Sequence, residues 1–450
     1  MKNIFLLVAA FIVLTTAYGQ NTKLVIKFAG KIEDPNYNSV AIVNDNGFKK
    51  IFELSAENDF SDTLTIPNKG MYTFSDGRES TVIYLAKDCD IYLTLNTKEF
   101  DESIKYTGKG SGNNNFLAQK YLINEREIGD GYALYGADEK AFLEKQKNVD
   151  KQYFDLLKEL KDQEFIDYQS KEILYNSFLA ISSYKTYHRY ITKDMSFEIS
   201  QEFLKPLLSL DFNNETDYVN FKSYKQLVNA NYLRGINDKN KIEQTLKNVC
   251  AIKSDKIKNG VINEILSSKL DVSNENVTLL YNTFIKVCND KFYTDEFTSR
   301  YNVIKKLLKG QPSPKFAFKD VNDKLVKLDD LKGKYVYIDV WATWCSPCLG
   351  EIPYLKKLEE DYHEKNIAFV SISVDNLKAY DKWKQMVADK NLKGYQLFAD
   401  KSWQSDFVQG YKIMGIPTFI LIDTNGNIVS ASAMRPSNPE LRALFDSLLK

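Results

Sequence analysis

The chain has 450 residues, 60 basic and 60 acidic side chains, and two histidines. At about 150 residues per domain, its length is enough for about three domains. The balanced charge gives no indication of a nucleic-acid surface or of a strongly acidic partner, and the wide separation of the histidines gives little support for a metal site.

The first 19 residues have the pattern of a cleavable signal peptide. Lys2 precedes an apolar run over residues 4–14, and small residues lead to Gly19. The apolar run is shorter than the roughly 20 residues that a membrane-spanning helix needs. We therefore expect export, cleavage after Gly19 and a periplasmic location, with a retained membrane anchor as the alternative.

Residues 20–113 predict a small, mostly β domain. Stretches such as "KLVIKFAG", "TVIYLA" and "DIYLTLN" are typical of strands, and Asn46-Gly47 suits a hairpin turn. The segment "GKGSGNNN" at 108–115 lacks the Gly-Lys-Ser/Thr ending of a phosphate-binding loop. Because glycine and asparagine favour turns, we interpret it as a flexible boundary loop.

Residues 114–309 predict an all-α domain. Phe142, Val149, Tyr153 and Leu157 recur at helical spacing among lysines and glutamates. The many aromatic side chains of this segment favour a packed core over a ligand site.

Three cysteines outside the C-terminal part, Cys89, Cys250 and Cys288, are predicted to be buried thiols. A disulfide between Cys250 and Cys288 stays open, because an oxidising compartment permits it and the sequence does not give its geometry.

Gly310, Pro312 and Pro314 interrupt the helical pattern and begin a domain over 310–450. Buried strands are predicted to alternate with helices there, so we expect an α/β sheet whose last two strands form a hairpin. The predicted elements are a strand at 335–341, a helix at 347–362, a strand at 367–375, a helix at 378–388, a strand at 415–423, a turn at 425–426 and a closing helix.

The motif "WATWCSPC" lies where the first of these strands turns into a helix. Cys345 is placed at the helix N-terminus, with Pro347 in the first turn. Free backbone N–H groups and the helix dipole stabilise a thiolate there, so Cys345 is the candidate nucleophile. Cys348, one turn later, can attack the mixed disulfide and release the partner.

Other uses of the two cysteines have less support. Zinc needs about four ligands, and no second pair is suitably spaced. Haem attachment needs a histidine where this chain has Leu349. A structural disulfide stays open, although closing so short a loop adds little stability. We expect thiol redox chemistry without a metal or cofactor.

Four segments of residues 310–450 together resemble the thioredoxin fold, and more narrowly the TlpA/ResA-like envelope thiol-disulfide oxidoreductases. They are "GKYVYIDVW", "WATWCSPC", "GEIP" at 350–353 and "GIPTFILID". The resemblance implies that the Ile416-Pro417 bond is cis and lies beside the cysteines, that the Ile416 backbone pairs with an extended substrate, and that Trp344 flanks the nucleophile. Residues 20–113 are similar, less specifically, to a β domain that precedes thioredoxin modules in some Gram-negative envelope proteins.

Two carboxylates are candidates for tuning proton transfer. Asp339 resembles the buried aspartate of thioredoxin, whereas the envelope family often has an amide or apolar residue at that position; a solvated carboxylate at the strand end is the alternative. Glu351 lies three residues after Cys348, so both share a helix face. A nearby carboxylate raises thiol pKa values and can transfer a proton. The alternative for Glu351 is an exposed position on the helix surface.

The sequence thus predicts an exported thiol-disulfide oxidoreductase that acts on cysteines of client proteins. Reduction is favoured over disulfide formation, since Ser346-Pro347 offers no cationic partner and Ile416 resembles the apolar residue of reducing thioredoxins. A reducing protein in an oxidising compartment needs a donor, and we expect a membrane thiol carrier. The alternatives are a binding protein that uses the module as a scaffold and, against the intact Cys-Ser-Pro-Cys motif, a peroxiredoxin.

Overall fold

The computed structural model describes residues 24–450, and its contacts divide the chain into two compact units. The first unit holds the described residues up to Asp211 and Asn220–Leu227, and the second holds Phe212–Val219 and Val228–Lys450. The signal-peptide prediction falls outside the described residues. The three-domain organisation stays a prediction. The contacts divide the helical segment, so that its first helices belong to the unit with the β-rich part and its last helices belong to the unit with the α/β part. No helix within residues 24–450 is both long and apolar enough to cross a membrane.

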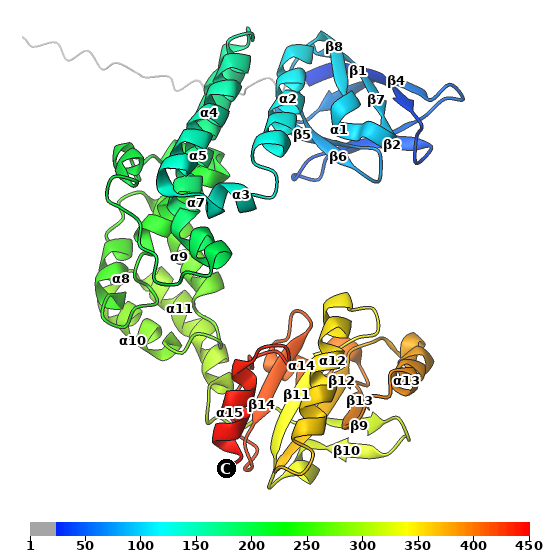
Figure 1. The fold of residues 1–450 in the computed structure, drawn as a ribbon, viewed down its shortest axis with the longest axis vertical. Helices are drawn as coiled ribbons and strands as arrows, with labels where there is room; N and C mark the ends of the chain where they lie inside the picture. The colour runs from blue at the N-terminus through cyan, green and yellow to red at the C-terminus, as the bar shows by residue number, and fades with distance from the viewer. Residues whose placement is uncertain (1–23) are drawn as a thin grey trace, which may run out of the picture. The chain divides into compact units, whose positions relative to one another are not determined.

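The first unit begins with two four-stranded sheets that pack face to face (Figure 1). Their orders are β4-β1-β7-β8 and β3-β2-β5-β6. Alternate residues are buried along β1, β2, β5 and β7. Phe28, Phe52, Phe60 and Phe74 form an aromatic cluster in the core between the sheets. The strands are β1 (Leu24–Glu33), β2 (Ser39–Val43), β3 (Lys49–Glu53), β4 (Asp59–Ile66), β5 (Gly70–Ser75), β6 (Ser80–Leu85), β7 (Asp90–Asn96) and β8 (Lys105–Lys109).

The segment "GKGSGNNN" is not the flexible loop that its composition suggested. Strand β8 ends at Lys109 and helix α2 (Ser111–Glu127) begins two residues later. The Asn114 side chain accepts a hydrogen bond from the backbone N–H of Tyr84 on β6 (2.7 Å) and donates one to the Tyr84 carbonyl (3.0 Å). The Asn115 side chain likewise accepts a hydrogen bond from the backbone N–H of Tyr106 on β8 (2.9 Å) and donates one to the Tyr106 carbonyl (2.8 Å). Two neighbouring amides therefore cap the outer strand of each sheet.

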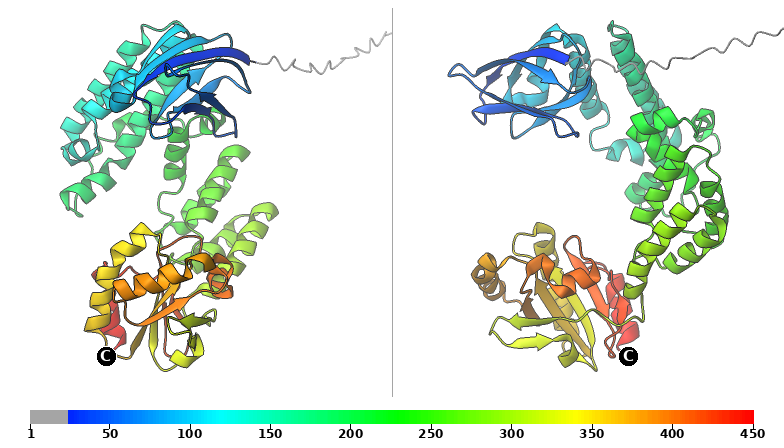
Figure 2. Two further views of the ribbon diagram at one scale, coloured as in Figure 1. Left: turned by 90° about the vertical axis from the view of Figure 1, so that its right-hand side faces the viewer. Right: turned by 180° about the vertical axis from the view of Figure 1, so that it is seen from behind.

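Helices follow the sandwich, as predicted, and can be followed from two sides in Figure 2. Short α1 (Phe100–Ser103) lies among the strands of the first unit, and α6 and α7 cross the boundary between the units in the sequence. The remaining bounds are α3 (Tyr132–Gly136), α4 (Glu139–Leu157), α5 (Gln163–Thr192), α6 (Glu215–Asn220), α7 (Lys222–Tyr232), α8 (Ile242–Cys250), α9 (Asp255–Ser268), α10 (Val277–Val287) and α11 (Lys291–Ile304).

The three cysteines outside the redox motif are free thiols. Cys89 and Cys288 are buried, as predicted, whereas Cys250 is partly exposed. Cys250 ends α8 and Cys288 directly follows α10, and the two residues are neighbours. Burial, together with the neighbouring Cys288, raises the pKa of the Cys250 thiol. Cys250 and Cys288 are therefore not joined by a disulfide in this structure.

The second unit contains the predicted α/β sheet, which confirms the fold class. Seven strands lie in the order β10-β9-β13-β12-β11-β14-β15, with β11 parallel to β12 and antiparallel to β14. The strands are β9 (Ala317–Asp320), β10 (Leu325–Lys327), β11 (Tyr335–Trp341), β12 (Ile367–Ser373), β13 (Tyr395–Phe398), β14 (Thr418–Ile422) and β15 (Ile428–Ser430).

Helices cover both faces of this sheet. Side chains of α12 (Ser346–Asp361) and α15 (Glu440–Leu448) pack with Tyr337 and Phe419 on one face. Side chains of α13 (Tyr380–Asp389) and α14 (Asp406–Tyr411) pack with Ile338 and Val340 on the other. Strand β11 is buried on both faces, as is typical of a central strand in an α/β sheet. The short segment after Trp341 connects it to α12.

Candidate active site

The cysteine pair lies at the predicted junction of strand and helix. Strand β11 ends at Trp341, and α12 begins at Ser346 with Pro347 in its first turn. Cys345 is the residue that caps the helix: its Sγ accepts a hydrogen bond from the backbone N–H of Cys348, at 3.2 Å. That hydrogen bond would favour a thiolate on Cys345 after reduction, since hydrogen bonding to a charged form stabilises it.

Cys345 and Cys348 form a disulfide, with their Cα atoms 5.3 Å apart. In this oxidised form the two residues are 4% and 3% exposed. Both sulfur-bearing residues are therefore nearly inaccessible in the disulfide form, and we expect Cys345 to be the more accessible of the two only after reduction.

Asp375 fixes the loop that carries the cysteines, and the sequence reasoning missed it. This buried carboxylate follows β12 and accepts hydrogen bonds from the Thr343 backbone N–H (2.8 Å) and hydroxyl (2.9 Å). Ser373 donates a third, at 2.8 Å. Because β12 is the parallel neighbour of β11, Asp375 and Thr343 meet at the same sheet edge. The signal in the sequence was an aspartate at the end of the predicted buried strand over 367–375.

The residues assigned to substrate contact by the resemblance also lie at this end of the domain. The Ile416-Pro417 bond is cis, as the resemblance implied. Ile416 packs against the hydrophobic core that contains both cysteines. Trp344 precedes Cys345 and is 59% exposed, so its ring is available to a partner.

Asp339 is a buried carboxyl on β11, 8% exposed. Burial raises its pKa to about 8, and the charges of Glu351 and Glu359 add to the shift. The alternative of a solvated carboxylate at the strand end is therefore wrong. At neutral pH most Asp339 side chains carry a proton.

Glu351 does not lie free on the surface of α12. Its carboxylate accepts hydrogen bonds from the backbone N–H (2.9 Å) and the hydroxyl (2.8 Å) of Ser437, a residue far along the chain. It remains close enough for its charge to raise the pKa of Asp339.

A second buried carboxyl, Glu359, was missed by the sequence reasoning. It lies on α12, is 7% exposed, and burial raises its pKa to about 7, while Lys393 and Lys356 oppose the shift. Asp339 and Glu359 line one small cavity of about 10 Å³, roughly the space of one water molecule. Trp341 also lines this cavity, and its buried indole Nε1 has no hydrogen-bond partner among residues 24–450.

Metal binding has no support at this site. Within residues 24–450, no group of three or more histidine, cysteine, aspartate or glutamate side chains is arranged to hold an ion. The arrangement offers a disulfide at a helix N-terminus, a cis-proline loop that packs against the same core, and a buried acid on the strand that leads into the motif.

This part of the chain is similar to known proteins. The model of the Redoxin family matches residues 308–444. The thioredoxin-like protein YneN of Bacillus subtilis is 32% identical over 137 residues, which are 30% of this chain and 78% of that protein. The thiol-disulfide oxidoreductase ResA of Bacillus cereus is 33% identical over 120 residues, which are 27% of this chain and 66% of that protein, just under two thirds of its length. A solution structure from Bacteroides vulgatus, assigned as a thiol-disulfide oxidoreductase, is 51% identical over 31% of this chain and 90% of its own, with a TM-score of 0.28.

Proposed function

Because the chain belongs to the thioredoxin-like thiol-disulfide oxidoreductases, we propose that Cys345 and Cys348 exchange a disulfide with cysteines of client proteins. The disulfide at the N-terminus of α12, capped by Cys345 itself, is the observation that carries the proposal. Such a position lowers a thiol pKa and so makes a nucleophile.

In the reducing direction, both cysteines begin as thiols. The Cys345 thiolate attacks one sulfur of a client disulfide, forms a mixed disulfide and releases one client thiolate. Cys348 loses its proton and attacks Cys345 Sγ, which releases the second client thiolate and forms the Cys345–Cys348 disulfide. Two electrons pass to the client, and two protons complete its thiols.

Asp339 is the proposed acceptor and donor of the Cys348 proton. A group whose pKa lies near the working pH exchanges protons most effectively, and the pKa of Asp339 is raised to about 8. The negative charge of Glu351 favours the protonated form of Asp339 and so helps to keep its pKa near the working pH. Ionised Asp339 would in turn raise the pKa values of the thiols.

Clients are proposed to bind in extended form across the cis-proline loop. The Ile416 backbone would pair with the client chain, and the exposed ring of Trp344 would contact it beside the sulfur under attack. Pro347 holds the start of α12 in place, since its fixed φ suits the first helical turn.

Reduction of clients in the cell envelope is the finer proposal. Ser346 and Pro347 offer no cation that would stabilise the reduced pair, and the fraction of Asp339 that is ionised would disfavour the thiolate further. We expect a potential nearer ~−270 mV than ~−120 mV. An envelope reductant would need a donor, proposed to be a membrane thiol carrier that re-reduces the pair.

Insulin reduction by dithiothreitol tests the chemistry. The Cys345→Ser variant is expected to lose catalysis, whereas Cys250→Ser, which removes a cysteine outside the pair, keeps it. If Cys345→Ser retained full activity, the alternative of a binding protein with a scaffold module would be preferred. Equilibration of the pair against glutathione tests the direction: a potential above about −180 mV, the range of an isomerase, would overturn the reductase proposal.

Client identity can be approached with the Cys348→Ala variant. It leaves Cys345 to form mixed disulfides that cannot be resolved. Covalent partners captured in the native envelope would then be identified by mass spectrometry, with Cys345→Ser/Cys348→Ala as the matched control.

A further inference from the structure

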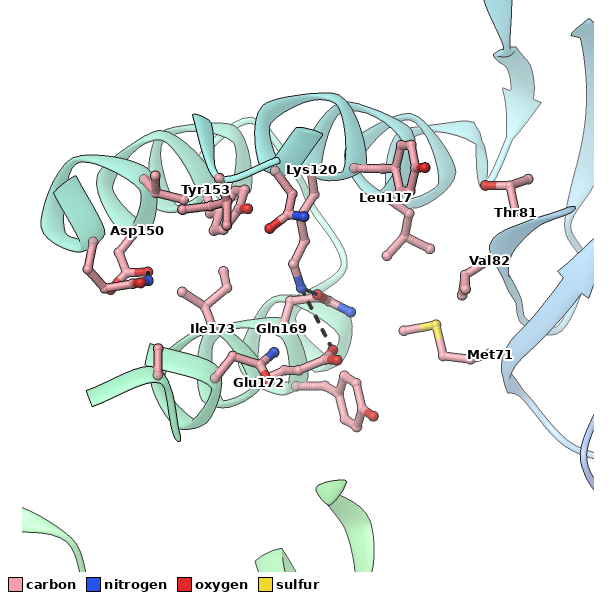
Figure 3. A pocket seen from close by; sticks show the side chains of 18 of the residues that line it. Met71, Thr81, Val82, Leu117, Lys120, Asp150, Tyr153, Gln169, Glu172 and Ile173 are labelled. Carbon is pink, nitrogen blue, oxygen red and sulfur yellow. Dashed lines mark hydrogen bonds and ion pairs between the residues drawn. The ribbon is translucent and has the colours of Figure 1, made fainter. Parts of the chain in front are cut away.

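The first unit contains a cavity of about 550 Å³, well within the range of ligand sites. Strands β5 and β6 form one wall, and helices α2, α4 and α5 form the others (Figure 3). Met71, Val82, Leu117 and Ile173 give it an apolar surface. Polar and tyrosine side chains make up much of the rest.

Strand β6 is the outer strand of its sheet, and its free edge lines this cavity. The backbone N–H and carbonyl of Tyr84 point outward, because they bond to the Asn114 side chain. In a strand, residues two apart direct these groups to the same edge. The backbone N–H and carbonyl groups of Val82 and Ser80 therefore also point outward. Among residues 24–450, no other segment forms a backbone hydrogen bond with these groups.

Opposite this edge lies an unpaired buried donor. Gln169 on α5 is fully buried, and its Nε2 has no hydrogen-bond partner within the described part of the chain. Its Oε1 accepts a hydrogen bond from Lys120 Nζ at 2.9 Å, which holds the amide in one orientation. Glu172, 3.9 Å from the same Nζ, supplies an acceptor in the wall. Figure 3 shows Lys120, Gln169 and Glu172 meeting between the helices, with Met71, Thr81 and Val82 facing them.

We propose that this cavity binds an extended peptide segment that adds to the free edge of β6 at residues 80 to 82. A peptide backbone presents the alternating donors and acceptors that a strand edge requires. The Gln169 amide would donate to a peptide carbonyl on the side away from β6. Apolar side chains of the peptide would lie against Met71, Leu117 and Ile173.

The test uses the oxidised full chain and fluorescein-labelled, cysteine-free nonapeptides that alternate leucine or valine with threonine or serine. Saturable binding is measured by fluorescence anisotropy. Val82→Pro, which removes the outward N–H, is expected to weaken binding about tenfold. Val82→Thr keeps that N–H and is expected to bind like the wild type. Gln169→Leu, which removes the unpaired donor, is also expected to weaken binding about tenfold. Circular dichroism shows whether each variant folds, and Gln169→Leu decides the test if Val82→Pro does not fold.

The outcomes separate this site from the redox chemistry. Cys345→Ser should bind peptides normally, so a failure of the thiol proposal would leave this one standing. The proposal is overturned if no peptide binds, if folded Val82→Pro or Gln169→Leu binds like the wild type, or if octanoate saturates the cavity while no peptide does.

Discussion

Asp339→Asn is expected to increase the free energy of unfolding of the C-terminal domain at neutral pH. In the folded protein the pKa of Asp339 is raised to about 8, chiefly by burial, from its ordinary value of 3.8. Between these values the folded state binds more protons than the unfolded state. Stability due to this group is therefore full below pH 3.8 and falls as the pH rises towards 8.

The magnitude follows from the size of the pKa shift. At ~1.36 kcal/mol per pKa unit, the raised pKa of Asp339 costs the folded wild type roughly 4 kcal/mol at pH 7 and roughly 2 kcal/mol at pH 5. The asparagine amide does not titrate, although its burial has a constant cost. The advantage of the variant over the wild type should thus grow by roughly 2 to 3 kcal/mol from pH 5 to pH 7.

The assay can be carried out on the full chain. Its four tryptophans are Trp341, Trp344, Trp383 and Trp403, so tryptophan fluorescence during guanidinium titration reports on this domain alone. The cysteine pair is kept oxidised throughout. Asp381→Asn, which changes an exposed carboxylate on α13, is the matched control and should follow the wild-type profile.

A difference between wild type and Asp339→Asn that stays constant from pH 5 to pH 7 would refute the reasoning. It would mean that the carboxyl titrates in the folded protein as it does in the unfolded chain.

Three other outcomes are expected. Glu359→Gln should remove a loss of stability that the wild type shows between pH 4.5 and about pH 7, since burial raises the pKa of Glu359 across that window; an unchanged fluorescence-monitored profile would contradict this. Asp375→Asn should lower the free energy of unfolding by about 2 kcal/mol and slow insulin reduction, because the Thr343 loop loses a charged acceptor; equal stability and rate would count against that anchoring role. Intact-mass measurement of protein from the envelope should find Gln20 as the first residue, and a mass that includes residues 1–19 would favour the anchored form.

The parts of the site that the sequence predicted depend on local patterns. An apolar run on both faces of β11, a proline in the first turn and two cysteines one turn apart are enough to place Cys345 at a helix N-terminus. The cis bond before Pro417 came from family resemblance and not from any local pattern.

The parts that the sequence did not predict depend on tertiary contacts. Glu359 has the sequence context of a solvated helix residue, and only the packing of α12 on β11 buries it. Asp375 acquires its role because two parallel strands end side by side. The residues of "GKGSGNNN" have turn propensities. The partners of Asn114 and Asn115 lie 30 and 9 residues away in the sequence, and the hydrogen bonds to them hold the two asparagines near the start of helix α2.

The paired amides of Asn114 and Asn115 also bear on how this chain behaves when it is crowded. The outer strand of a sheet is a template on which another molecule can continue the sheet. Each amide satisfies the donor and acceptor of one residue and so ends the hydrogen-bond ladder at Tyr84 or Tyr106. Two adjacent side chains that contribute to neither hydrophobic core therefore limit where another molecule could continue either sheet: strand addition would stop at Tyr84 and Tyr106, while residues 80 to 82 of β6 stay open to the proposed peptide.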